Sequence, residues 1–171
     1  MIVGESYNIG QWFGLTWRED VVMVTMLDGE RIAYHFPKPP VPHGTGHVKL
    51  VTAWANASMG QLPLTNIREE WETDAGPVTM SFDLHGVTHC LKPRLYPGIA
   101  DLEMIDQVSE LLPDPASRFL LFGATYIGAG AILLTPEERA ALERLNWRFL
   151  DGATAMRLVD EGITILEGDE P

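Results

Sequence analysis

The chain has 171 residues, of which 46% are hydrophobic and 21% are charged. This is enough for one ordinary domain whose hydrophobic core needs neither disulfides nor metals. Acidic side chains outnumber basic ones by 24 to 12, which gives a formal net charge of −12. A surface of this sign repels the phosphate backbone of nucleic acids, and therefore argues against nucleic-acid binding.

The negative charge is unevenly placed along the chain. Residues 101–171 carry 14 acidic and 5 basic side chains, a net charge of −9, whereas residues 1–100 carry 10 and 7. Such a surface attracts a basic protein partner. The plainer interpretation is that the charge only keeps the protein in solution, and the composition leaves both open.

Cysteine content and the first residues point to a compartment. The single cysteine, Cys90, cannot form an internal disulfide, which fits a reducing cytosol. The start, MIVGESYNIGQWFG, has neither a basic region nor a long apolar run. No window approaches the roughly 18 apolar residues of a membrane span. We expect a cytoplasmic protein that does not associate with membranes.

The first third of the chain predicts strands. Residues 21–36 are rich in β-formers around Asp28-Gly29, a preferred pair for a type I′ hairpin turn. Residues 37–46, PKPPVPHGTG, contain four prolines and two glycines, which exclude a helix and a central strand. The next segment, HVKLVTAWA at residues 47–55, is rich in β-formers and predicts another strand.

The middle of the chain predicts an antiparallel meander. Residues 67–73 and 78–84 form a hairpin around a turn at 74–77, and His85-Gly86 joins the second strand to residues 87–93. A two-residue turn at His85-Gly86 fixes the register of the last two strands. On that register one face is apolar and consists of Met80, Phe82, Leu84, Val87, His89 and Leu91. The more polar face consists of Ser81, Asp83, Thr88 and Cys90.

The last third mixes helices and strands. Apolar residues at helical spacing predict a helix over residues 100–112, which Pro113 ends. Residues 118–134 predict two short strands around a glycine-rich link. Thr135 and Glu138 form a capping box at the start of a helix over residues 135–147. A short helix at 153–162 and a last strand at 163–166 complete the prediction.

Together these elements predict an α+β fold. We expect an antiparallel sheet of about six to eight strands, built from hairpins and a meander, with two or three helices in the C-terminal half. Residues 1–171 would form a single domain. A boundary near residue 95, within KPRLYPG, is the alternative division.

The histidines do not form a recognisable metal motif. His89 and Cys90 are adjacent on a predicted strand and therefore point to opposite faces, so they cannot share a metal. The spacing of His43 and His47 suits zinc only on a helix, and the proline-rich segment predicts none. We predict no metal site and no cofactor. Whether any of the five histidines binds a ligand stays open; they are His35, His43, His47, His85 and His89.

Catalytic motifs are also not recognisable. The segment GATYIGAGA lacks the Lys-Ser/Thr ending of a phosphate-binding loop. Neither a Ser-His-Asp nor a Cys-His nor a His-Glu-x-x-His pattern stands out. We therefore predict no catalytic residue. Because catalytic groups meet in space and not in sequence, this lowers the expectation of an enzyme without excluding one.

Two acidic segments are candidates for binding a basic partner. On a strand, Glu70, Glu72 and Asp74 share one face, while Glu69 and Trp71 share the other. Such a row of like charges is typical of a solvated surface, or of a strip that meets Lys and Arg side chains. The predicted partner-binding residues are Glu69, Glu70, Trp71, Glu72 and Asp74 on the strand, and Asp101, Glu103, Asp106 and Glu110 on the helix.

One part of the chain resembles a known class of proteins. The segments DLHGVTHCLKP, GIADLEMIDQVSELLP, RFLLF and GAILLTPEERAALERL follow one another between residues 78 and 146. This layout resembles the C-terminal arrangement of some immunity proteins of bacterial polymorphic-toxin systems. There a strand pair leads to a helix, a strand, and a helix capped by Leu-Thr-Pro-Glu. The resemblance implies an acidic, non-enzymatic, cytosolic inhibitor that binds a cognate toxin.

The sequence therefore favours an immunity-type protein that neutralises a basic toxin by covering its active site. Two other functions stay open. One is a small enzyme or small-molecule binder with a pocket in the sheet, near Tyr34, His35 or His89. The other is a structural or assembly subunit. The sequence also leaves a homodimer open.

Overall fold

The computed structural model describes residues 31–35, 46–96, 100–125, 128–144 and 147–161. Over these residues the chain forms two three-stranded antiparallel sheets and four helices, three of them in the C-terminal half. The predicted α+β class is confirmed. The described strands form two sheets instead of the one continuous sheet that we expected.

The first sheet has the order β1-β6-β5 and joins distant parts of the sequence. β5 (Arg118–Thr125) and β6 (Gly128–Leu134) are the two strands predicted around the glycine-rich link. β1 (Ile32–His35) pairs with β6, with Ile32 opposite Ile132. The expected hairpin partner of β1, residues 21–27, lies outside the described residues.

The second sheet is the predicted meander, with β2 (Thr65–Trp71), β3 (Val78–Leu84) and β4 (Val87–Leu91) in the order β2-β3-β4. Phe82 pairs with His89, and Leu84 with Val87, as predicted. The conformation of the turn between β3 and β4 sets this register. His85 and Gly86 have φ angles of 52° and 80°, the left-handed values that a type I′ turn requires at both central residues.

Residues 47–55 are not a strand, and our prediction there was wrong. They lie within helix α3 (Gly46–Ala57). The buried residues of α3 are His47, Leu50, Val51, Trp54 and Ala57. They recur every three or four positions, which places them on one helical face. Burial of this face outweighs the β-propensity of the valines and threonine, because local propensity is weak against tertiary packing.

The other three helices agree with the sequence in place but less well in length. α4 (Met104–Ser109) is shorter than the predicted helix over 100–112. α5 (Pro136–Arg144) starts with the predicted capping box. The Glu138 amide donates to the Thr135 hydroxyl (3.2 Å), and the Thr135 amide donates to the Glu138 carboxylate (2.9 Å). α6 (Gly152–Asp160) confirms the short last helix. The strand expected at 163–166 lies outside the described residues.

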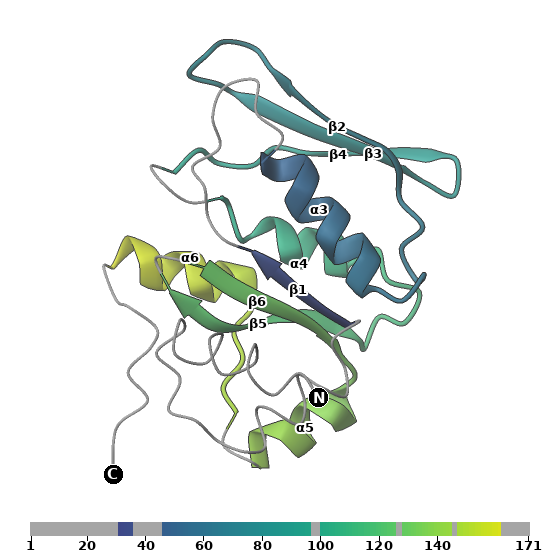
Figure 1. Ribbon diagram of the computed structural model, residues 1–171, viewed down its shortest axis with the longest axis vertical. Coiled ribbons are helices and arrows are strands. Elements are labelled where there is room, and N and C mark those ends of the chain that lie inside the picture. The colour runs from purple at the N-terminus through teal and green to yellow at the C-terminus, as the bar shows by residue number, and fades with distance from the viewer. Residues whose placement is uncertain (1–30, 36–45, 97–99, 126–127, 145–146, 162–171) are drawn as a thin grey trace, which may run out of the picture.

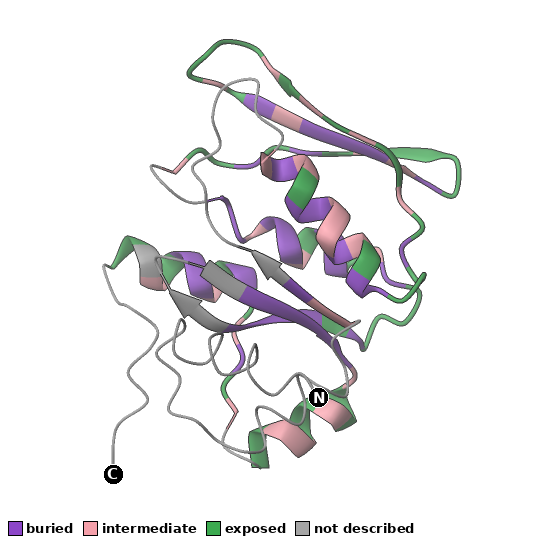
Figure 2. Cartoon of the chain, in the orientation of Figure 1, coloured by how far each residue is buried: buried purple, intermediate pink, exposed green. Residues whose placement is uncertain are grey.

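The elements stack in layers (Figure 1). α3 and α4 lie between the two sheets, and α5 packs on the far side of β6. The main core joins both sheets through residues such as Trp54, Phe82 and Phe119, which come from both sides of residue 95. A second cluster around Phe122 and Phe149 covers the other face of β5 and β6. The buried positions therefore concentrate where helices meet sheets (Figure 2).

The helical assignment of α3 leads to a testable prediction. Trp54→Ala should lower the free energy of unfolding by about 3–5 kcal/mol, the usual cost of deleting a buried aromatic side chain, because Trp54 is only 1% exposed. Lys49→Ala, on the exposed face of the same helix, should change it little. Chemical denaturation followed by circular dichroism measures both. Equal losses for the two variants would contradict the observed orientation of α3.

Candidate functional site

The structure divides the nine predicted partner-binding residues by where their side chains point. Glu69, Asp101 and Asp106 turn into the protein and accept hydrogen bonds from backbone amides. A second group is exposed and consists of Glu70, Glu72, Asp74 and Glu110. Trp71 is half-buried, and Glu103 pairs with a neighbouring arginine. The acidic residues therefore do not form one continuous binding surface.

Glu69 joins the second sheet to helix α3. Alternation along β2 points its side chain toward α3, where it is 5% exposed. Its Oε2 atom accepts hydrogen bonds from the backbone amides of His47 (3.0 Å) and Val48 (3.3 Å). Its Oε1 atom accepts one from the Trp71 indole (3.1 Å). A carboxylate at this position satisfies free amides and complements the positive end of the helix dipole.

His47 lies directly beside this carboxylate and is completely buried. Its Nδ1 atom is 3.5 Å from Glu69 Oε2, and neither ring nitrogen makes a hydrogen bond within the described part of the chain. The ring centroid lies 6.4 Å from that of Trp71. Burial lowers the pKa of His47 below its ordinary value of 6.5, and the charges of Glu69 and Asp101 oppose this shift only in part. The imidazole is therefore neutral at pH 7.

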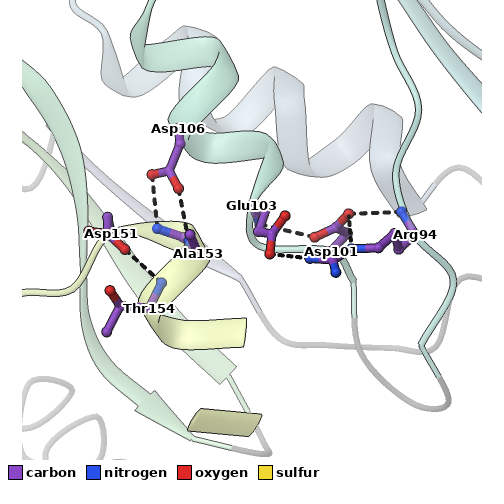
Figure 3. Close-up of polar contacts among 8 residues, drawn as sticks. Arg94, Asp101, Glu103, Asp106, Asp151, Ala153 and Thr154 are labelled. Carbon is purple, nitrogen blue, oxygen red and sulfur yellow. Dashed lines mark hydrogen bonds and ion pairs between the residues drawn. The ribbon is translucent and has the colours of Figure 1, made fainter. Parts of the chain in front are cut away.

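Asp101 organises the segment between β4 and α4 (Figure 3). It is 3% exposed and accepts hydrogen bonds from the backbone amides of Arg94 (2.8 Å) and Glu103 (3.1 Å). The Arg94 side chain pairs with the Glu103 carboxylate and lies over the Tyr96 ring, 5.4 Å from its centroid. Both acidic residues thus have partners within the fold.

Asp106 connects α4 to the start of α6 (Figure 3). Its carboxylate accepts hydrogen bonds from the backbone amides of Gly152 (2.9 Å) and Ala153 (2.8 Å). Burial raises the pKa of Asp106, and these two amides oppose the shift. The start of α6 lies close to the residues just ahead of α4, so that a Cβ atom added at Gly152 would overlap the backbone carbonyl of Leu102. Asp106 therefore holds the N-terminus of α6 in place.

The outward-facing acidic residues follow β2 and the turn after it. Glu70 is 73% exposed, and its nearest basic partner is Arg68 at 3.5 Å. Glu72 and Asp74 are exposed as well. We call Glu70, Glu72 and Asp74 the β2 acidic strip. β2 lies at the outside of the molecule, whereas α4, which precedes Glu110, lies between the sheets (Figure 1).

The described histidines and the cysteine do not come together. The half-buried His89 ring stacks on Phe82, with centroids 5.7 Å apart. His85 is exposed in its turn, and Cys90 is exposed on the other face of β4. Within the described part of the chain, no group of three or more His, Cys, Asp or Glu side chains could hold a metal ion. His43 lies outside that part.

Sequence reasoning missed the contact between His47 and Glu69. Two patterns could have indicated it. The spacing of His47 from Leu50, Val51 and Trp54 places it on the buried helical face, once the segment is taken as a helix. Alternation already placed Glu69 on the opposite face of β2 from Glu70. No local sequence pattern indicates that α3 packs against β2.

Comparison with protein-family models, curated proteins and solved structures finds no match. No helix among the described residues is long and apolar enough to cross a membrane. Any functional conclusion therefore depends on the charges and geometry described above.

The role of Asp106 can be tested by removing its carboxylate. Asp106→Ala should lower the free energy of unfolding by about 0.5–2 kcal/mol, because the amides of buried Gly152 and exposed Ala153 lose the carboxylate that caps α6. Glu110→Ala, one turn further along the chain and exposed, is the matched control and should leave stability unchanged within error. Thermal and chemical denaturation measure both variants. A stable Asp106→Ala protein would show that the contact to α6 contributes nothing.

Proposed function

We propose that the chain is an acidic inhibitor of the immunity type, which binds a basic toxin and covers its active site. The net charge of −12 supports this function, because it attracts a positively charged protein over long distances. The resemblance of residues 78–146 to immunity proteins supports it as well. The same charge argues against nucleic acid as the partner.

The observation that carries the proposal is the β2 acidic strip. Its three carboxylates are exposed on the strand and turn at the outer side of the molecule. Unlike Glu69 and Asp106, Glu70 and Glu72 accept no hydrogen bond from a described backbone amide. The ion pair of Glu70 with Arg68 is exposed, so a partner can compete for it. Lys or Arg side chains around a cationic active site would meet them, with water displaced at the contact.

Apolar contact would have to supply the centre of such an interface, because rim charges mainly accelerate association. Trp71 is half-buried on the face of β2 opposite the strip, and its indole N–H is already used by Glu69. Val87, at the start of β4, is 58% exposed. Val87 is therefore the most accessible large apolar side chain of the second sheet that a partner could cover.

The test uses charge reversal on the strip, because reversal at Asp106 would disturb the fold. Wild-type protein, immobilised at about 50 mM salt, should capture a basic protein from a lysate of the native host. The purified captured protein should lose its activity on binding. Glu70→Lys/Glu72→Lys should weaken that affinity by about tenfold or more, mainly through slower association. The control is Glu137→Lys/Asp160→Lys, which changes the net charge equally at exposed positions on α5 and α6.

Two outcomes would contradict the proposal. The first is a captured protein whose activity is unchanged in the complex. The second is an affinity that stays constant between about 50 and 500 mM salt, because contacts between exposed charges weaken as salt screens them. A reversal that weakens binding no more than the control would remove the strip from the interface.

A further inference from the structure

His47 is a buried polar side chain whose hydrogen-bonding groups are unsatisfied among the described residues. Its ring is fully buried, and among the described residues neither ring nitrogen has a hydrogen-bond partner. Buried polar atoms are normally paired, because an unpaired one loses its bonds to water without replacement. A side chain placed in this way costs stability even when neutral, and would cost more when charged.

The groups around the ring decide what protonation would do. Of the described ionisable side chains, Glu69 from β2 and Asp101 ahead of α4 act on it, and both favour the charged form. Two further strands pack on α3: β6 carries no ionisable residue, and β1 carries His35. Two features disfavour the charged form of the imidazole. The ring is buried, and it lies in the first turn of α3, at the positive end of the helix dipole.

Glu69 cannot neutralise the imidazolium without giving up other contacts. Its Oε2 atom already accepts two backbone amides of α3, and its Oε1 atom accepts the Trp71 indole. A hydrogen bond from Nδ1 requires the ring or the carboxylate to move, because the present 3.5 Å contact lacks hydrogen-bond geometry. The second nitrogen, Nε2, would remain buried and unpaired. Proton uptake therefore sets the ring in competition with the cap of its own helix.

We propose that His47, Glu69 and Trp71 form a pH-sensitive clasp between α3 and β2, which opens when His47 takes up a proton from solvent. In the open state the imidazolium is hydrated and the first turn of α3 leaves Glu69. Opening loosens the connection between β2 and the rest of the core. The clasp would act whether or not the chain binds a basic protein, because its three side chains face inward.

The direction of the pH dependence follows from proton linkage. The closed state holds the pKa of His47 below 6.5, whereas the open state restores the ordinary value. Above pH 6.5 neither state binds the proton, so the closed state keeps its full stability. As the pH falls below 6.5, the open state gains the proton first. The opening constant then rises by up to about tenfold per pH unit, until the closed state is protonated as well.

Hydrogen exchange of the full chain tests the clasp. Protection of the amides in α3 and β2 is measured by mass spectrometry between about pH 7.5 and 5, corrected for intrinsic exchange rates. In the wild type it should fall by up to about tenfold per pH unit below 6.5, more steeply than protection in α5. His47→Gln, which cannot take up a proton, should show no such slope. The matched control is His85→Asn, an exposed turn residue whose replacement tolerates a positive φ.

A wild-type slope that His47→Gln abolishes and His85→Asn retains would establish the clasp. Constant protection in the wild type, or the same slope in His47→Gln, would overturn it. If His47→Gln does not fold, an NMR titration of the wild-type His47 imidazole tests whether its protonation opens the clasp. Ionisation below pH 6.5 that coincides with exchange broadening in α3 supports the clasp. Ionisation at or above 6.5 with α3 unchanged overturns it.

Discussion

The carboxylate of Glu69 is the contact that sets how helix α3 sits on the second sheet. Apart from His47, the side chains that α3 buries are apolar, and apolar burial is non-directional, so it favours contact without fixing one register. Two hydrogen bonds from α3 amides to this buried carboxylate do fix it, since they join β2 to the first turn of the helix. A third, from the Trp71 indole on the same strand, helps to hold the carboxylate in place. Asp106 does the same for α6 from α4. Two of the helix N-termini are thus held by acidic residues from neighbouring elements.

This use of carboxylates changes the meaning of the net charge. A surplus of acids in the sequence suggests a strongly negative surface, yet part of that surplus serves as acceptors for backbone amides. Glu69, Asp101 and Asp106 have most of their bonding capacity occupied within the fold. The charge that a partner could meet is limited to outward positions, of which the β2 acidic strip is the clearest. Binding to a partner therefore depends on which acidic side chains face outward, and not on how many acidic residues the chain contains.

Features that depend on neighbouring residues could be predicted, and features that depend on distant ones could not. The β3-β4 register followed from strand alternation and the His85-Gly86 turn, and the start of α5 from its capping box. α3 was mistaken for a strand because its composition favours strands, while its buried face shows only in the spacing. The contact of Asp106 with Gly152 spans 46 residues, and no local pattern predicts it. Likewise, alternation separated Glu69 from Glu70 but could not show what each side chain meets.

The central claim is that orientation separates acidic residues that hold the fold from those that face outward. The most direct test compares the free energies of unfolding of Glu69→Ala and Glu70→Ala, adjacent residues of β2 with the same chemistry. Glu69→Ala should cost about 2 kcal/mol, because a helix cap is lost and buried amides are left unpaired. Glu70→Ala should leave stability unchanged within error. Equal effects for the two variants would contradict the account.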